Sequence, residues 1–163
     1  MLRAVEEHLG STQVARVIYG AIIGLALVVA LQKHPPSAGV MVGSMLGTAV
    51  AVGLAELYAE VIGAEVRTRH RVEREHFGEI AVDVGAVVLG VGFPAVFFIL
   101  AAAGVMKVDT AFTFAKWSGL GLIGFYGFIA AKLAGAKLTT ALIQATAVAL
   151  IGAFLIVLKA LIH

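Results

Sequence analysis

The sequence predicts an all-α fold: a polytopic membrane protein in which residues 1–163 form a single domain, a bundle of five transmembrane helices. Its composition is the first indication, because 61% of the 163 residues are apolar and only 13% are charged, whereas a soluble domain averages about 45–50% apolar and about 25% charged residues. The mean hydropathy of +1.02 is the second. The third is that the apolar residues gather into five runs, each close to the about 20 residues with which a helix crosses the hydrocarbon core.

The same composition argues against a soluble enzyme, a disordered chain and a nucleic-acid reader. The formal charge is only +2, and the charged residues are too few to form a basic face. The absence of cysteine excludes disulfide scaffolds, thiolate zinc sites and thiol catalysis. The sequence contains no nucleophile–base pair, phosphate-binding glycine loop or HExxH motif. We therefore expect no enzymatic activity, no resident cofactor and no nucleic-acid partner, and the lipid bilayer as the surroundings of the chain.

The five expected spans cover about residues 14–31, 39–66, 79–105, 110–133 and 138–162. The first is stopped by Pro35 and Pro36, which cannot continue a helix. Within the third, Pro94 predicts a kink. Residues 1–13 mix charged and apolar side chains, which is typical of a short amphipathic helix on the membrane surface.

The orientation of the bundle follows from its lysines and arginines, because these residues are enriched in cytoplasmic loops. The larger group of them lies at the N-terminus, in the second-to-third loop and in the fourth-to-fifth loop: Arg3, Arg16, Arg67, Arg69, Arg71, Arg74, Lys132 and Lys137. The opposite side receives only Lys33, Lys107, Lys116 and Lys159. We therefore expect a cytoplasmic N-terminus and a C-terminus on the opposite side.

Glycines at four-residue spacing predict how the spans pack. Gly20 and Gly24 form such a pair in the first span, and Gly39, Gly43 and Gly47 extend the spacing through the second. Small residues at this spacing let helix backbones approach closely inside a membrane. The spacings favour a tight bundle and a dimer seam.

Two glutamates lie inside the second span, where charge is costly. An ionisable side chain at the middle of a membrane helix costs about 2.5–3.5 kcal/mol on insertion scales. Glu56 and Glu60 are four residues apart and share a helical face. Counted back from Arg67 at about 1.5 Å per residue, Glu60 lies about 10 Å deep and Glu56 about 16 Å. The alternative is that the span ends earlier and both are interfacial carboxylates.

A second acidic face opens the third span. Glu79 and Asp83 are four residues apart, and His76 precedes Glu79 by three. Carboxylates and an imidazole that converge near a membrane surface can bind a divalent cation, relay protons or pair with arginines. For the arginine-rich stretch at 67–75 we expect a solvated helical extension with ion pairs along it. The candidate ion or proton site therefore consists of Glu56, Glu60, Glu79, Asp83 and His76.

The layout resembles the vacuolar iron transporter family. Residues 18–25, Ile-Tyr-Gly-Ala-Ile-Ile-Gly-Leu, resemble the small-residue run of the family's first helix, and residues 53–58, Gly-Leu-Ala-Glu-Leu-Tyr, resemble its Gly-Glu-Tyr before an arginine-rich exit. Residues 127–135 and 138–159 resemble its final helical hairpin. The resemblance implies five membrane helices, a cytoplasmic N-terminus and a homodimer.

The sequence departs from this family at two places. The family's membrane aspartate falls on Ile23, which cannot ligate a metal or carry a proton. The glutamate-rich cytoplasmic metal-binding domain is reduced to residues 67–75. A cation path would therefore use Glu56, Glu60, Glu79 and Asp83 instead of the family's own site.

Two functions of different classes remain. The first is a small transporter of divalent cations such as iron or manganese, with proton coupling, in which the metal ion is substrate and Glu56 and Glu60 are the intramembrane carboxylates. The second is a non-transporting scaffold, regulatory protein, or partner- or lipid-binding protein in which those glutamates form interhelical hydrogen bonds or pair with Lys116 or Lys132. The composition, rich in alanine, valine and glycine, and the short loops suit a bacterial inner membrane.

Overall fold

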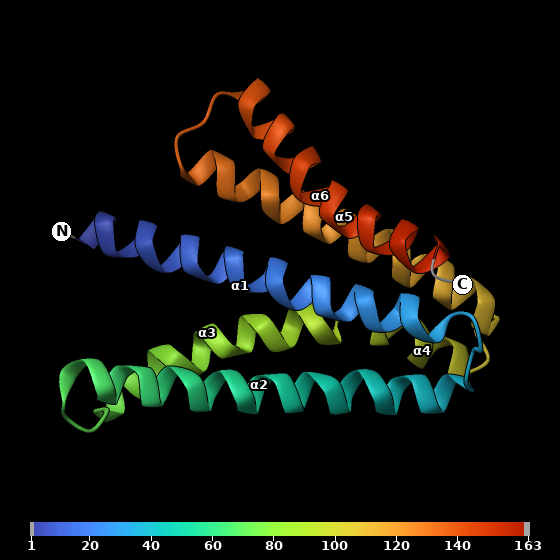
Figure 1. The fold of residues 1–163 in the computed structure, drawn as a ribbon, viewed down its shortest axis with the longest axis horizontal. Helices are drawn as coiled ribbons and strands as arrows, with labels where there is room; N and C mark the ends of the chain where they lie inside the picture. Colours follow the sequence, from blue (N-terminus) through green and yellow to red (C-terminus); the bar gives the residue numbers. More distant parts are fainter. Residues whose placement is uncertain (1, 162–163) are drawn as a thin grey trace.

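The computed structural model describes residues 2–161, and helices joined by short turns make up this part of the chain, without a strand. Its helices, in chain order, are α1 (Leu2–Leu31), α2 (Ala38–Thr68), α3 (Arg74–Gly92), α4 (Ala95–Ala102), α5 (Val108–Leu133) and α6 (Leu138–Leu161). The predicted all-α fold is therefore confirmed. Figure 1 shows the long helices alternating in direction, so that the α2–α3 and α5–α6 turns lie at the end where α1 begins and the α1–α2 and α4–α5 turns lie at the other.

Three helical segments are long and apolar enough to cross a membrane: Gln13–Leu31 in α1, Ala38–Thr68 in α2 and Val108–Leu133 in α5. A fourth candidate is the pair α3 and α4, which passes the same test when taken together and is bent by 50°. In α6, a shorter apolar helix covers Leu138–Phe154. These helices indicate an integral membrane protein with three candidate spans in the described residues, or four when the bent pair is counted as one span.

The bend between α3 and α4 lies where the sequence predicts it. α3 ends at Gly92 and α4 begins at Ala95, with the buried Pro94 at its N-terminal boundary. Proline lacks the amide hydrogen that would continue the helical ladder, and its ring clashes with the carbonyl one turn earlier. The expected kink at Pro94 is confirmed.

Two expected boundaries differ from the structure. The arginine-rich stretch is not a continuous helix: α2 ends at Thr68 and α3 begins only at Arg74. Arg69 adopts a left-handed conformation with φ of 57°, which ends α2, and its amide donates to the carbonyl of Glu65 at 2.8 Å. The first helix shows the opposite difference, because α1 runs without a break through the expected surface segment and the first span. The side chains of residues 1–12, on which the amphipathic prediction depends, lie outside the described residues.

α1 and α3 approach each other so closely that their backbones touch. A methyl group built on Gly20 would lie 2.2 Å from the carbonyl oxygen of Val87, and one on Gly24 would lie 2.8 Å from that of Val91. On the other helix, a methyl group on Gly90 would lie 2.5 Å from the carbonyl oxygen of Val17. The glycine pair of the first span therefore holds α1 against α3 within one chain, by the close approach that small residues allow in membranes.

The second glycine series has a different place. A methyl group on Gly39, Gly43 or Gly47 would have no described atom within 4 Å. This stripe therefore lies on the outside of α2, away from the other described helices. These three glycines therefore do not contribute to the packing of the described helices against one another.

The apolar core is densest at the end of the bundle that holds the α1–α2 and α4–α5 turns. Val28, Met41, Met45, Phe98 and Phe112 form one buried cluster there, drawn from α1, α2, α4 and α5. The rings of Phe98 and Phe112 meet edge to face, with their centroids 4.9 Å apart, an arrangement that aromatic pairs prefer.

Candidate functional site: an arginine among three carboxylates

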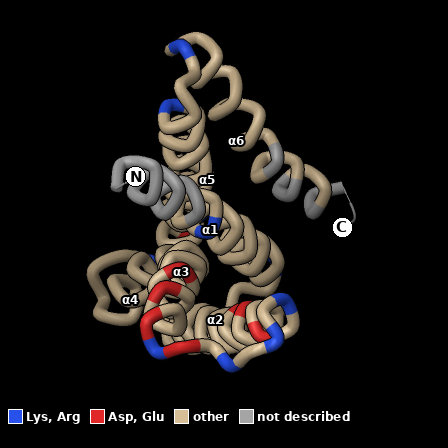
Figure 2. Tube along the Cα trace, turned by 90° about the vertical axis from the view of Figure 1, so that its left-hand side faces the viewer, with Lys and Arg blue, Asp and Glu red and all other residues tan. Residues whose placement is uncertain are grey.

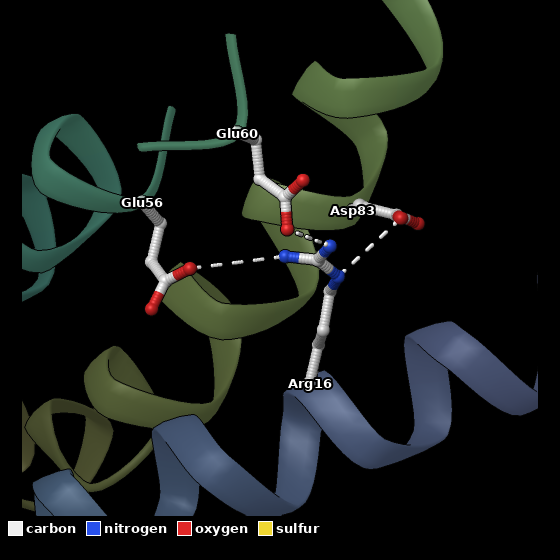
Figure 3. A network of polar contacts seen from close by, with 4 residues as sticks. All are labelled: Arg16, Glu56, Glu60 and Asp83. Atoms are coloured by element: carbon white, nitrogen blue, oxygen red, sulfur yellow. Dashed lines mark hydrogen bonds and ion pairs between the residues drawn. The ribbon is translucent and has the colours of Figure 1, made fainter. Parts of the chain in front are cut away.

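Three of the ionisable side chains predicted inside the apolar helices converge on one arginine (Figure 3). Arg16 projects from α1 and lies between Glu56 and Glu60 of α2 and Asp83 of α3. Its Nη2 lies 2.7 Å from Oε1 of Glu60, its Nε lies 3.3 Å from Oδ2 of Asp83, and its Nη1 lies 3.8 Å from Oε2 of Glu56. Each carboxylate therefore faces a different nitrogen of the same guanidinium.

The register of α1 against α3 brings Arg16 to Asp83. The two helices run in the same direction, and the backbone contacts pair Gly20 with Val87 and Gly24 with Val91. One helical turn earlier, the same offset pairs residue 16 with residue 83. The glycines thus have a second effect beyond close packing, because they set the register that joins the two charges.

The cluster lies inside the bundle, toward the α2–α3 turn. At about 1.5 Å per residue, Glu56 lies about 18 Å and Glu60 about 12 Å from the Thr68 end of α2. The side chains are largely buried: the exposed fraction is 18% for Arg16, 17% for Asp83, 26% for Glu56 and 32% for Glu60. The four groups are therefore neither free in solvent nor enclosed in the apolar core.

The charges of the cluster do not balance. When all four side chains are ionised, one guanidinium faces three carboxylates and the formal net charge is −2. Of the three carboxylates, only Glu60 accepts a hydrogen bond from Arg16. Nε of Arg16 and Oδ1 of Asp83 are buried without a hydrogen-bond partner among the described residues. The arrangement therefore leaves both charge and hydrogen bonding unsatisfied. This is costly, because an unpaired polar atom that is buried loses its hydrogen bonds to water.

Arg16 also spans a gap between two helices. α1 packs mainly against α3 and α5, and α2 packs mainly against α3 and α4, whereas α1 and α2 scarcely touch. Figure 1 shows α1 and α2 on opposite sides of α3. The long arginine side chain therefore supplies a polar link between α1 and α2.

His76 and Glu79 lie apart from this cluster. Nδ1 of His76 is 3.1 Å from Oε2 of Glu79, and both side chains are more than half exposed near the start of α3. With Asp83 they share one face of α3, at spacings of three and four residues. The five predicted site residues thus fall into a partly buried group of three and an exposed pair.

Within the described residues, no three His, Cys, Asp or Glu side chains are arranged so that they could hold a metal ion. The carboxylates of Glu56, Glu60 and Asp83 spread around the guanidinium instead of facing a common empty centre (Figure 3). Any cation that uses all three carboxylates would therefore need Arg16 to move.

Arg16 is the residue that sequence reasoning missed. The sequence analysis counted it only among the charges that set orientation. Its position between Val14 and Val17, both buried, could have identified it, because an ionisable residue inside an apolar run is itself a sign of a functional site. The scaffold hypothesis named Lys116 or Lys132 as partners of Glu56 and Glu60, but the ion pairs in the structure are with Arg16.

The remaining charges gather at the surface. Figure 2, which views the molecule from the end where α1 begins, shows acidic and basic residues concentrated around the α2–α3 turn. The ion pairs expected along this stretch are not formed: among the described residues, Arg67, Arg69, Arg71 and Arg74 have no carboxylate within 4.0 Å. Exposed pairs of this kind contribute little in any case.

Comparison with known proteins assigns no family: no protein-family model, curated protein or solved structure matches the chain. The resemblance to vacuolar iron transporters therefore stays a prediction.

Proposed function

We propose that the protein is a small membrane transporter in which Glu56, Glu60 and Asp83 take up a cation. The observation that carries this proposal is the excess of negative charge. One carboxylate suffices to neutralise Arg16, yet three face it. A net charge of −2 between membrane helices attracts positive charge, which a divalent metal ion or protons can supply.

The surface pair on α3 supports a route to the cluster. His76 and Glu79 are exposed at the end of α3 that leads into the α2–α3 turn, and Asp83 follows on the same face with only 17% of its side chain exposed. Polar groups therefore follow one helical face from the surface to Arg16. We assign His76 and Glu79 to the mouth of this route.

The proposed topology has five spans: α1, α2, the bent pair of α3 and α4, α5 and α6. The alternating directions of these segments support it (Figure 1). The distribution of lysine and arginine favours a cytoplasmic N-terminus, and the composition suits a bacterial inner membrane. The resemblance to vacuolar iron transporters makes Fe²⁺ and Mn²⁺ the first cations to test and adds a homodimer to the proposal.

A flux assay tests the proposal directly. Purified protein is reconstituted into proteoliposomes, and Mn²⁺ or Fe²⁺ entry is followed with an internal fluorescent indicator. We expect the double variant Glu56→Gln, Glu60→Gln to lose at least nine tenths of the flux. The matched control is Glu73→Gln, Glu75→Gln, which removes two exposed carboxylates outside the cluster. Flux that is equal in the wild type and the Glu56, Glu60 variant would contradict the proposal.

A second candidate function is favoured by one specific observation. Arg16 links α1 to α2 where the two helices scarcely touch. In a non-transporting scaffold, such ion pairs would serve only to hold the two helices together. On this hypothesis the wild-type protein moves no cation. The variant Glu56→Gln, Glu60→Gln then changes only the thermal stability or the oligomeric state, which calorimetry and light scattering measure.

A further inference from the structure

We infer that Arg16 is a tethered counter-ion that stays beside Asp83 and competes with the transported cation for Glu56 and Glu60. The inference rests on the proposed function and concerns how that site is occupied. It assigns to Arg16 two states: one among the three carboxylates and one displaced from Glu56 and Glu60 when a cation binds.

The position of the guanidinium supports competition. Its three nitrogens each face one carboxylate, at 2.7, 3.3 and 3.8 Å. A metal ion that binds carboxylates from several sides needs their oxygens at about 2.0–2.6 Å around one centre. In the structure the guanidinium occupies that centre (Figure 3). A cation and Arg16 therefore cannot engage all three carboxylates at once.

The contacts that join Arg16 to α2 are few: one hydrogen bond to Glu60 and ion pairs with Glu60 and, at 3.8 Å, with Glu56. A guanidinium and a carboxylate bind most strongly through two parallel hydrogen bonds. Arg16 forms no such pair here, because its one hydrogen bond within the cluster is to Glu60. Among the described residues, its Nε and the Oδ1 of Asp83 have no hydrogen-bond partner. Displacing the guanidinium from α2 therefore breaks one hydrogen bond, to Glu60, and the ion pairs with Glu60 and Glu56.

The packing decides which partner Arg16 keeps. α1 and α3 are in backbone contact at Gly20 and Val87, one turn from Arg16 and Asp83. This contact holds Arg16 close to Asp83. Glu56 and Glu60 lie on α2, which scarcely touches α1. A bound cation would therefore release Arg16 from α2 while Asp83 retains it, and would loosen α1 from α2.

The test is Mn²⁺ affinity, measured by electron paramagnetic resonance of Mn²⁺ titrated into the purified full-length protein. We expect Arg16→Gln to bind Mn²⁺ at least tenfold more tightly than the wild type, because the competing positive charge is gone. Arg67→Gln, which removes an exposed arginine outside the cluster, should leave the affinity unchanged. An affinity that is equal or weaker in Arg16→Gln would overturn the inference.

Chemical rescue separates competition from a purely structural role. In Arg16→Ala the side chain is replaced by space, so added methylguanidinium should weaken Mn²⁺ binding in proportion to its concentration. The same compound should have no effect on the wild type, whose site already holds a guanidinium. Absence of this competition in a folded Arg16→Ala protein would contradict the inference.

A third variant applies where removal of the charge prevents folding. Arg16→Lys keeps the charge but replaces the planar fork of three nitrogens with one ammonium nitrogen, so the contact of a separate nitrogen with each carboxylate is lost. It should bind Mn²⁺ more tightly than the wild type by a smaller factor, about two- to fivefold, since part of the competition is lost. Unchanged affinity in Arg16→Lys would count against the inference.

The two proposals fail in different ways. If the wild type moves Mn²⁺ but Arg16→Gln does not bind it more tightly, only the role of Arg16 is wrong. If the wild type moves no cation and none of the Arg16 variants binds Mn²⁺, the proposed function is wrong.

Discussion

The two ends of the bundle hold the same helices together by different means. Toward the α1–α2 turn, Val28, Met41 and Phe98 bury apolar surface from three helices against one another. Toward the α2–α3 turn, α1 and α2 are joined through the guanidinium of Arg16. Packed apolar side chains have one good arrangement, whereas an ion pair can exchange partners. We therefore expect the end near the α1–α2 turn to be rigid, and the end near the α2–α3 turn to be able to change its ion pairs.

The largest expected effect on stability is at the apolar end. Phe98→Ala should lower the free energy of unfolding by about 3–5 kcal/mol, because Phe98 is fully buried and its removal leaves a cavity. Val96→Ala is the control, since Val96 is 51% exposed, and should change stability by less than about 0.5 kcal/mol. Unfolding in mixed detergent micelles measures both. A loss below about 1 kcal/mol for Phe98→Ala would show that this end is not the rigid one.

An intermediate effect is expected at the contact between α1 and α3. Gly20→Ala should cost about 1–3 kcal/mol of stability, because the new methyl group would meet the carbonyl oxygen of Val87 and force the helices apart. Gly43→Ala places a methyl group in open space on α2. This control should leave the stability unchanged or raise it by up to about 1 kcal/mol, as expected for a glycine in a helix interior. Similar losses of stability in both variants would show that the α1–α3 contact is not what makes Gly20→Ala destabilising.

Gly20→Ala also bears on the charged end. By shifting α1 against α3, it should separate Arg16 from Asp83 and so reduce cation flux in proteoliposomes. Gly43→Ala should not, because it lies outside this contact. Normal flux in a Gly20→Ala protein whose stability is lowered would show that the register is unimportant for the site.

The smallest effect on stability is expected at the carboxylates. Glu56→Gln should change the free energy of unfolding by less than about 1 kcal/mol in either direction, because the lost attraction to Arg16 is offset by relief of repulsion among the carboxylates. Glu60→Gln should cost more than Glu56→Gln, since only Glu60 accepts a hydrogen bond from Arg16. The same unfolding assay compares the free energies of unfolding of the two variants. A loss above about 3 kcal/mol for Glu56→Gln would mark the cluster as structural.

Several features could be predicted from local sequence alone. Long apolar runs require helices that satisfy their own backbone hydrogen bonds in lipid, so the all-α fold follows from composition and spacing. Pro94 breaks its helix because of its own covalent geometry. Glu56 and Glu60 were identifiable as unusual because charge inside an apolar run is costly wherever that run is placed.

Other features depend on which helices meet, and no local pattern specifies this. The spacing of Gly20 and Gly24 predicts a close helix contact, but only the tertiary structure identifies α3 as the partner and leaves Gly39, Gly43 and Gly47 on the outside. The arginine-rich stretch was expected to be helical, and the left-handed Arg69 ends α2 instead.

From the amino-acid sequence alone it follows that this protein is helical and apolar, and that a few carboxylates lie where charge is costly. Which groups those carboxylates face depends on the tertiary structure. Arg16 is 40 or more positions away from each of them in the sequence, and the register of α1 against α3 brings it to Asp83. Local propensity depends on neighbours along the chain, whereas the charge balance of the site depends on which helices pack together.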